Sequence, residues 1–305
     1  MKKGRLFDRL EKPFVFVVVT MLHSYLFCQG HNQQVQAPEY DFRIKEGVQY
    51  APSTSLRLKL DVAYPVNTPR NILVIMMHGG GWDKGDKDVF RSEMEYLAKK
   101  GWPVATINYR LSNEAVFPAQ YEDVWSAVRY FSHQYPNIVL LGHSAGGHLA
   151  ALAGLHQPVT EKPKNLIKGI ISLDGVHDMR YETLKRQNWP FRSIFERLLG
   201  GSLDDPVIQG LAVRASPIAY VDSWKDSLRR APKILLIHGK KDFAVPQAQF
   251  RDFAEALENA DFSLVQAQPD SGHYVWYEQR EQTFALIEQF LESLENGLEV
   301  QKAGR

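Results

Sequence analysis

The chain contains one cysteine, Cys28, among its 305 residues. The absence of thiols after this position excludes an internal disulfide, a cysteine nucleophile and a zinc site built on sulfur from the rest of the chain. Stability must therefore come from a hydrophobic core. With 44% hydrophobic and 23% charged residues, the chain has the composition of a globular protein and enough length for a sizeable core.

An excess of charge of either sign is also missing. Lys and Arg number 36 against 35 Asp and Glu, so the formal net charge is +1. This balance does not favour a polyanionic partner, and we expect no nucleic acid to bind. The sequence also lacks internal repeats, low-complexity tracts and linkers that would divide the chain.

The longest apolar run, from Phe14 to Phe27, is too short to cross a bilayer, because it has about fourteen residues and a spanning helix needs ~20. Several Lys and Arg residues precede it, which is the pattern of an export signal. We expect residues 1–30 to be a cleaved signal peptide and the protein to be secreted or periplasmic, with no stable membrane span. Lipid attachment at Cys28 and a buried N-terminal helix remain alternatives.

Continuous apolar runs alternate with helical patterns over most of the chain. A polar stretch over residues 31–51 comes first, and residues 58–62 then alternate apolar and polar side chains, which indicates an antiparallel strand near a sheet edge. The later runs are typical of parallel strands buried on both faces, and they lie at 72–77, 104–107, 138–141, 167–173 and 234–237. Helical patterns cover 92–100, 119–133, 145–156, 247–260 and 278–294. The sequence predicts an α/β fold with a mostly parallel sheet flanked by helices.

One stretch, from residue 178 to about 220, interrupts this alternation. It mixes aromatic and charged residues and contains a helical pattern over 205–213. We interpret it as a helical cap inserted into one domain of residues 31–305. Its aromatic residues Trp189, Phe191 and Phe195 are expected to be core residues and not part of a site.

The most informative motif is the pentapeptide from Gly142 to Gly146, which has Ser144 at its centre. It lies between an apolar run and a helix start rich in small residues, so the serine stands on a tight strand-to-helix turn. This is the context of a nucleophile elbow, where side chains two positions either way from the serine would collide with backbone. Ser144 is the candidate nucleophile, with an ordinary glycine-rich turn as the alternative.

A glycine triplet follows the first buried strand, in the segment from His78 to Trp82. Backbone N–H groups of such a loop can stabilise the negative charge of a tetrahedral intermediate. We predict that Gly80, Gly81 and Ala145 donate to this oxyanion. A phosphate-binding loop is the alternative, but no Lys-Ser/Thr pair follows and no G-x-G-x-x-G is complete.

Two further strand ends supply the partners that a serine nucleophile needs. Asp242 follows the run at 234–237, and His273 lies in the loop after the next predicted strand. In an open α/β sheet, reactive groups collect at the carboxyl ends of strands. The order Ser, Asp, His is that of α/β hydrolases, so His273 is the candidate base and Asp242 the candidate acid. Asp174 and Asp178 are rival acids.

Other histidines and aromatic residues lie close to these motifs in the sequence. His78, His143 and His148 show no metal-ligand spacing with carboxylates, so neither a metal nor another cofactor is expected. The candidate substrate-binding residues are Trp82, Phe243 and Tyr274, with plain packing as the alternative.

These motifs together resemble the α/β-hydrolase carboxylesterases, over nearly everything from Leu60 to Leu294. The likeness is greatest to the hormone-sensitive-lipase-like and feruloyl/acetylxylan-esterase-like branches. Besides the elbow and the glycine triplet, it is carried by Leu60-Asp61-Val62 before Tyr64-Pro65, by Asn108-Tyr109-Arg110-Leu111, and by Phe117-Pro118-Ala119-Gln120 with Glu122-Asp123.

The resemblance implies an α/β-hydrolase fold and a serine carboxylesterase that hydrolyses short acyl or aromatic acyl esters without a cofactor. Its expected substrate is a small-molecule or carbohydrate ester, such as an acylated plant polysaccharide. Similar folds also cleave amides, so an amide hydrolase such as an arylformamidase or exopeptidase stays open. A catalytically silent binding module is a third possibility, although such a protein usually lacks one of the three residues and none is missing here.

Overall fold

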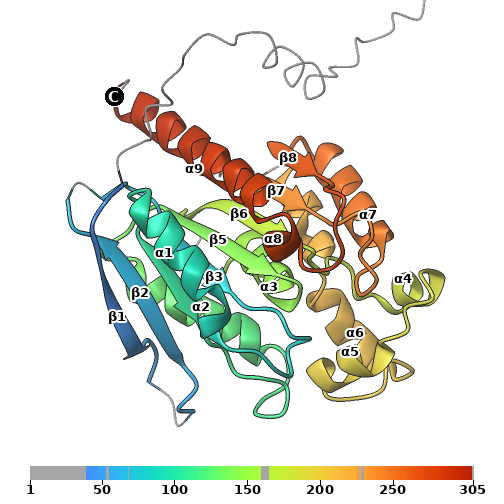
Figure 1. Cartoon of the computed structure of the whole chain (residues 1–305). Helices are drawn as coiled ribbons and strands as arrows, with labels where there is room; N and C mark the ends of the chain where they lie inside the picture. The colour runs from blue at the N-terminus through green and yellow to red at the C-terminus, as the bar shows by residue number, and fades with distance from the viewer. Residues whose placement is uncertain are drawn as a thin grey trace, which may run out of the picture. The chain divides into compact units, whose positions relative to one another are not determined.

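An eight-stranded sheet organises residues 39–303, which this computed structural model describes except for 53–54, 68, 159–164, 226 and 228–229. The strand order is β1-β2-β4-β3-β5-β6-β7-β8 (Figure 1). β1 (Phe42–Gln49), β2 (Lys59–Pro65) and β4 (Val104–Ile107) pair antiparallel, and all pairs from β4 to β8 are parallel. The expected leader, with Cys28, lies outside the described residues.

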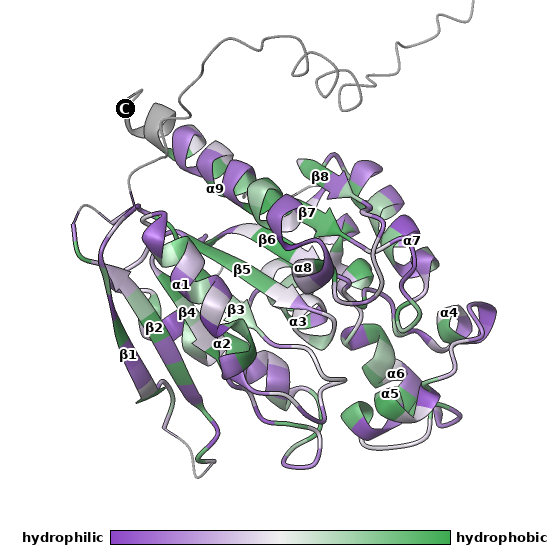
Figure 2. Ribbon diagram, in the orientation of Figure 1, coloured by the Kyte–Doolittle hydropathy of each residue, from purple (hydrophilic) through white to green (hydrophobic). Residues whose placement is uncertain are grey.

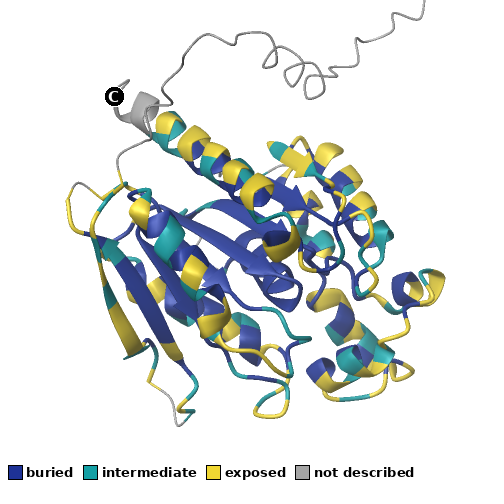
Figure 3. Ribbon diagram, in the orientation of Figure 1, coloured by how far each residue is buried: buried dark blue, intermediate teal, exposed yellow. Residues whose placement is uncertain are grey.

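The remaining strands up to β7 match the apolar runs of the sequence closely, and β8 is the strand predicted before His273. They are β3 (Leu73–Met77), β5 (Ile138–His143), β6 (Ile167–Leu173), β7 (Lys233–Ile237) and β8 (Leu264–Ala267). In each of the strands β3, β4, β5, β6 and β7 nearly every residue is buried, as strands covered on both faces require (Figure 3). The predicted α/β class with a mostly parallel sheet is confirmed.

The alternating segment predicted as an antiparallel strand near a sheet edge is β2, and both its pairing and its place near the edge are confirmed. β1, from the stretch that we expected to be only polar, pairs outside β2, so β2 is the second strand of the sheet. β2 also has no solvent-facing side around Asp61, because this carboxylate is buried. It accepts hydrogen bonds from the Gly47 N–H at 2.8 Å and from the Lys87 ammonium at 2.9 Å, which offset the cost of burial.

Helices cover both faces of the sheet. α1 (Arg91–Lys99) and α9 (Arg280–Ala303) contribute to the core on one face, whereas α2 (Ala119–Phe131), α3 (Ala145–Leu155) and α7 (Gln247–Glu258) pack on the other. Apolar and polar residues alternate along the ribbons of α1, α2, α7 and α9, whereas α3 is buried over its whole length (Figure 2). A short helix, α8 (Val275–Glu278), precedes α9, so the helix predicted at 278–294 begins at Arg280 and continues beyond 294 to Ala303. No helix among the described residues is both long and apolar enough to span a membrane.

The insertion between β6 and β7 is helical, as predicted (Figure 1). It contains α4 (Tyr181–Arg186), α5 (Arg192–Leu199) and α6 (Pro206–Arg214), followed by the short 3-10 turns η4 (Pro217–Tyr220) and η5 (Asp222–Trp224). Asp205 caps α6 by accepting a hydrogen bond from the Val207 N–H at 2.8 Å. These helices form the cap.

Candidate active site

Ser144 stands on the turn between β5 and α3 with φ 53° and ψ −116°, a strained conformation for a residue other than glycine. The flanking glycines explain how this turn closes. A Cβ at Gly142 would lie 2.1 Å from the backbone of Gly146, and a Cβ at Gly146 would lie 2.0 Å from the Met77 carbonyl oxygen. The elbow therefore holds the serine side chain at the end of the central strands and admits no larger residue at either position.

The structure brings the three candidate catalytic side chains together. The Nε2 atom of His273 lies 3.0 Å from the Ser144 hydroxyl oxygen, and its Nδ1 atom lies 2.9 Å from a carboxylate oxygen of Asp242. Because an ionised carboxylate can only accept, Nδ1 carries the proton and donates it to Asp242. Nε2 is then the acceptor for the serine hydroxyl, which is the arrangement of a base beside a nucleophile.

The surroundings of Asp242 keep it ionised. Burial alone would raise the pKa of this carboxyl, but the hydrogen bond and charge of His273, the Val245 N–H and the nearby His238 outweigh burial and lower the pKa. Its second oxygen accepts hydrogen bonds from the N–H groups of Ala244 at 2.8 Å and Val245 at 2.9 Å. The loop after β7 thus fixes the direction of the carboxylate.

The structure pairs neither rival acid with His273. Asp178 is paired with the Arg180 guanidinium and accepts a hydrogen bond from the Thr183 hydroxyl at 2.8 Å. Asp174 is completely buried, and its oxygens accept the N–H groups of Gly239 and Val275. Neither carboxylate is bonded to the ring of His273.

The glycine loop lies directly against the elbow. A Cβ built on Gly79 would lie 3.2 Å from the Cβ of Ser144. Among the described residues, none accepts a hydrogen bond from the backbone N–H of Gly80, Gly81 or Ala145. Gly80 and Gly81 line the cavity beside the serine, and Ala145 begins α3, where the first N–H groups have no partner within the helix. These donors are therefore free for an oxyanion.

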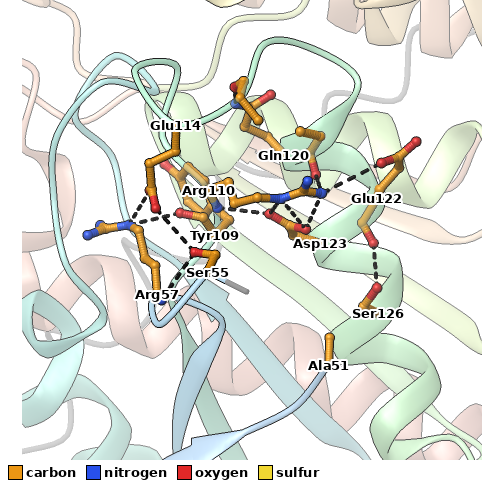
Figure 4. Close-up of polar contacts among 12 residues, drawn as sticks. Ala51, Ser55, Arg57, Tyr109, Arg110, Glu114, Gln120, Glu122, Asp123 and Ser126 are labelled. Carbon is orange, nitrogen blue, oxygen red and sulfur yellow. Dashed lines mark hydrogen bonds and ion pairs between the residues drawn. The ribbon is translucent and has the colours of Figure 1, made fainter. Parts of the chain in front are cut away.

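Residues of the Asn108-Tyr109-Arg110-Leu111 segment bond to the glycine loop and to the residues that pack next to it. The Tyr109 hydroxyl donates to the His78 carbonyl at 2.9 Å, and the two rings stack with centroids 4.4 Å apart. Arg57 donates to the Tyr109 carbonyl at 2.9 Å, and Arg110 forms a two-pronged ion pair with Asp123 on α2 (Figure 4). The motifs that carry the family resemblance after β4 thus hold the backbone next to the glycine triplet.

A cavity of about 560 Å³ opens over Ser144 and His273. The glycine loop forms one part of its wall and the cap another. Of the candidate substrate-binding residues, Trp82 and Tyr274 line this cavity, whereas Phe243 does not and is 74% exposed. The role of Phe243 in substrate binding stays a prediction.

The sequence interpretation missed the part that the cap plays in the cavity. The cap residues lining it are Trp189, Phe191, Ile194, Phe195 and Arg197. Trp189 also donates its indole N–H to the Ala244 carbonyl at 3.0 Å, which joins the cap to the loop that carries Asp242. The concentration of aromatic residues in the insertion was the available signal, but the sequence does not show on which side they face.

Three buried histidines around the site are held neutral. Burial lowers the pKa of His78 to about 4, of His143 to about 3 and of His148 to about 4. His143, inside the elbow, lies with Nε2 at 2.6 Å from the His273 carbonyl oxygen. Ligand atoms of His143, Asp174 and His273 lie close enough together to hold an ion, but hydrogen bonds within the protein already engage each of these side chains.

Comparison with known proteins places this geometry in a family. Residues 60–257, more than half of the chain, match the BD-FAE family. The chain belongs to the BD-FAE family. The BD-FAE match runs from β2 to the end of α7 and includes Ser144 and Asp242, whereas His273 lies beyond it and is placed by the structure. The predicted resemblance to α/β-hydrolase carboxylesterases is confirmed.

Relatives of this BD-FAE member include more than one kind of hydrolase. Esterase LipQ of Mycobacterium tuberculosis is 32% identical over 208 residues, which are 63% of this chain and 47% of LipQ, so the chain spans about half the length of that relative. A kynurenine formamidase of Salmo salar is 27% identical over 72% of both chains. A truncated form of a carbohydrate esterase from gut microbiota has a TM-score of 0.67 at 24% identity, covering 85% of this chain and 98% of that one. This likeness supports the α/β-hydrolase fold.

Proposed function

We propose that this chain is a serine hydrolase that cleaves carboxylic ester bonds without a cofactor. The observation that carries the proposal is the continuous set of hydrogen bonds from Ser144 through His273 to Asp242, at 3.0 Å and 2.9 Å. The similarity to esterase LipQ supports the same chemistry. The three positions also follow the chain order of α/β hydrolases.

The geometry assigns a role to each residue in acylation. Ser144 attacks the ester carbonyl carbon while its proton passes to Nε2 of His273. The carbonyl electrons move onto oxygen, and N–H groups of Gly80, Gly81 and Ala145 stabilise the resulting oxyanion. The C–O bond to the alcohol then breaks, and the His273 proton leaves with the alcohol. Asp242 stabilises the imidazolium during these steps.

Deacylation repeats this sequence with water as the nucleophile. His273 accepts a proton from the water, which attacks the acyl carbon bound to Ser144. When the tetrahedral intermediate collapses, the proton returns to the serine oxygen and the carboxylic acid is released. The same donors serve both steps, and the enzyme returns to its starting state.

The walls of the cavity favour short acyl or aromatic acyl groups. The rings of Trp189, Phe191 and Phe195 supply apolar contact, and aromatic rings bind other rings well. Tyr274, which is 49% exposed at the cavity, can stack against a sugar ring of a carbohydrate ester. The carbohydrate esterase of similar fold supports such a substrate.

A second candidate function is amide hydrolysis by the same three residues. The similarity to a kynurenine formamidase over 72% of the chain favours it. Rates on a matched ester and amide of the same acyl group would separate the candidates, and we expect the ester to react faster.

The proposal includes export through the leader at residues 1–30. Its support is the order of basic residues and an apolar run in the sequence. N-terminal sequencing of the protein recovered from the native host tests this. A first residue at His31 is expected, and an uncleaved start or a lipid on Cys28 would contradict it.

Hydrolysis of short p-nitrophenyl esters tests the activity. S144A removes the nucleophile and is expected to lower kcat by at least about 10⁴-fold. S132A provides a matched control, because the Ser132 hydroxyl lies at the end of α2 and, within the described part of the chain, bonds to the Arg129 carbonyl alone. Equal rates for S144A and the wild type would rule the proposed nucleophile out.

A further inference from the structure

Asp174 is a buried carboxylate that the proposed reaction does not use. It follows the last residue of β6, has no solvent exposure and adopts φ +50°, a conformation that costs energy in any residue except glycine. Its own N–H donates to the Ile237 carbonyl at 2.9 Å, so the residue is fixed between β6 and β7. A buried carboxylate in a strained conformation persists only where its surroundings require it.

The two oxygens of Asp174 hold two different loops. Oδ1 accepts the Gly239 N–H at 2.8 Å, three residues before Asp242. Oδ2 accepts the Val275 N–H at 3.1 Å, two residues after His273. One side chain therefore bridges the loop that carries the acid and the loop that carries the base, although it is bonded to neither catalytic side chain.

The loop of His273 has two more attachments of the same kind. The His143 ring lies with Nε2 at 2.6 Å from the His273 carbonyl oxygen, and the Gly272 N–H donates to Glu278 at 2.7 Å. Side chains thus fix three backbone groups of this loop, which are the N–H of Gly272, the carbonyl of His273 and the N–H of Val275. Of these three side chains, Asp174 is the one that also bonds to the loop of Asp242. Backbone hydrogen bonds from Lys240 to the Pro269 carbonyl and from Lys241 to the Ser271 carbonyl, both at 2.9 Å, join the same two loops farther from the catalytic side chains.

We propose that Asp174 is a positioning residue, which sets the distance between Asp242 and His273 by binding the backbone of both loops. The inference rests on the proposed function for its effect on catalysis, but the bridge itself does not. A shift of about 1 Å in reacting groups can cost about 100-fold in rate. The bridge should therefore affect the chemical step more than substrate binding, since Asp174 does not line the cavity.

Two substitutions give graded effects. D174N keeps the volume but accepts only one of the two N–H groups, and its amide NH₂ faces the other donor. D174A removes both bonds. We expect kcat to fall about tenfold for D174N and about 100-fold for D174A, with KM within about threefold of the wild type. D61N is the matched control, because Asp61 is also buried and accepts a backbone N–H, but lies on β2.

Hydrogen exchange measures the bridge without any substrate. In both Asp174 variants, amides of residues 239–245 and 272–278 should exchange faster than in the wild type, whereas D61N should leave them unchanged. This readout remains valid if S144A shows that the proposed function is wrong. It can also be made on D174N alone if D174A does not fold.

The pH dependence of stability gives a second readout. Burial, together with the nearby Asp242 and Glu278, raises the pKa of Asp174 to about 8, although the Gly239 and Val275 N–H groups act to lower it. The imidazoles close to the same group are those of His143, His238 and His273. Since the folded pKa exceeds the unfolded value, this carboxyl reduces stability as pH rises from about 4 to about 8. The loss of stability between pH 4 and pH 8 that Asp174 causes should be absent from D174N and present in D61N.

The outcomes decide the proposal. Slower turnover at unchanged KM, with faster exchange in both loops, supports it. Wild-type kcat in D174A overturns it, and so does slower turnover with unchanged exchange in either loop. A rise in KM at unchanged kcat would place Asp174 in substrate binding and would also overturn it.

Discussion

Trp82 donates its indole N–H to Nδ1 of His148 at 3.1 Å, and this bond joins the glycine loop to α3. Because Nδ1 accepts, the imidazole proton must lie on Nε2, which donates to the Ala215 carbonyl at 2.6 Å. Ala215 ends the α6 segment of the cap. One neutral histidine thus connects the oxyanion loop, the helix after the nucleophile and the cap.

Replacing Trp82 by Phe should therefore affect both stability and catalysis. W82F leaves the buried Nδ1 of His148 without a donor, which costs about 1–3 kcal/mol in the free energy of unfolding. We also expect a lower kcat at similar KM, because the glycine loop loses an attachment. Urea denaturation and steady-state kinetics measure the two effects. Additive effects of W82F and H148Q in the double variant would contradict a direct link between these residues.

Stability should fall as the pH decreases below about 6.5. Burial lowers the pKa of His78 and His148 to about 4, and of His143 and His177 to about 3. Between those values and 6.5 the unfolded chain binds more protons, so each histidine contributes a slope of up to about 1.4 kcal/mol per pH unit. Urea denaturation at pH 7.0, 6.0 and 5.0 measures the slope. A free energy of unfolding that stays constant over this range would contradict neutral buried imidazoles.

Substituting the acid should reduce turnover strongly without removing the fold. In D242N the amide NH₂ can donate to Nδ1 of His273, which favours the tautomer whose proton lies on Nε2, so the serine loses its acceptor. We expect kcat to fall by about 10⁴-fold. The control is D178N, since Asp178 is not bonded to His273. A D242N enzyme within tenfold of the wild type would point to a different acid.

The cap should set the preference for acyl size. Trp189 lines the cavity, so W189A enlarges it and exposes apolar wall to longer acyl chains. Each additional buried methylene is worth about 0.8 kcal/mol, and kcat/KM for hexanoyl relative to acetyl esters should rise several-fold. W189F keeps an aromatic ring but lacks the indole N–H that bonds to the Ala244 carbonyl. It therefore separates the effect of the lost hydrogen bond from the effect of a larger cavity. An unchanged ratio in W189A would show that the acyl group binds elsewhere.

The sequence allowed the fold and the candidate catalytic residues to be predicted because both follow from local patterns. Apolar runs mark buried strands, and reactive side chains come directly after them in the glycine triplet, the elbow and the loops of Asp242 and His273. The edge strand β1 was missed, because most of its residues are exposed, none is buried and they show no apolar run. The burial of Asp61 was missed for a related reason, since its partners Gly47 and Lys87 are distant along the chain.

The features missed at the site depend on the direction in which side chains point, which the sequence does not show. Trp189 and Phe195 were interpreted as core, and both are indeed mostly buried, but the same rings face the cavity. Asp174 was considered as an acid because it ends a strand. The sequence contains no sign that its oxygens accept N–H groups from two other loops, because those contacts join residues 65 and 101 positions away.

Covalent labelling tests the central claim most directly. A p-nitrophenyl phosphonate ester should modify the wild-type enzyme once, and peptide mass spectrometry should locate the adduct on Ser144. Labelling should be at least about 100-fold slower in H273A, because the hydroxyl then lacks its base. An adduct on another residue, or equal labelling rates in the wild type and H273A, would contradict the account of Ser144 as a nucleophile activated by His273.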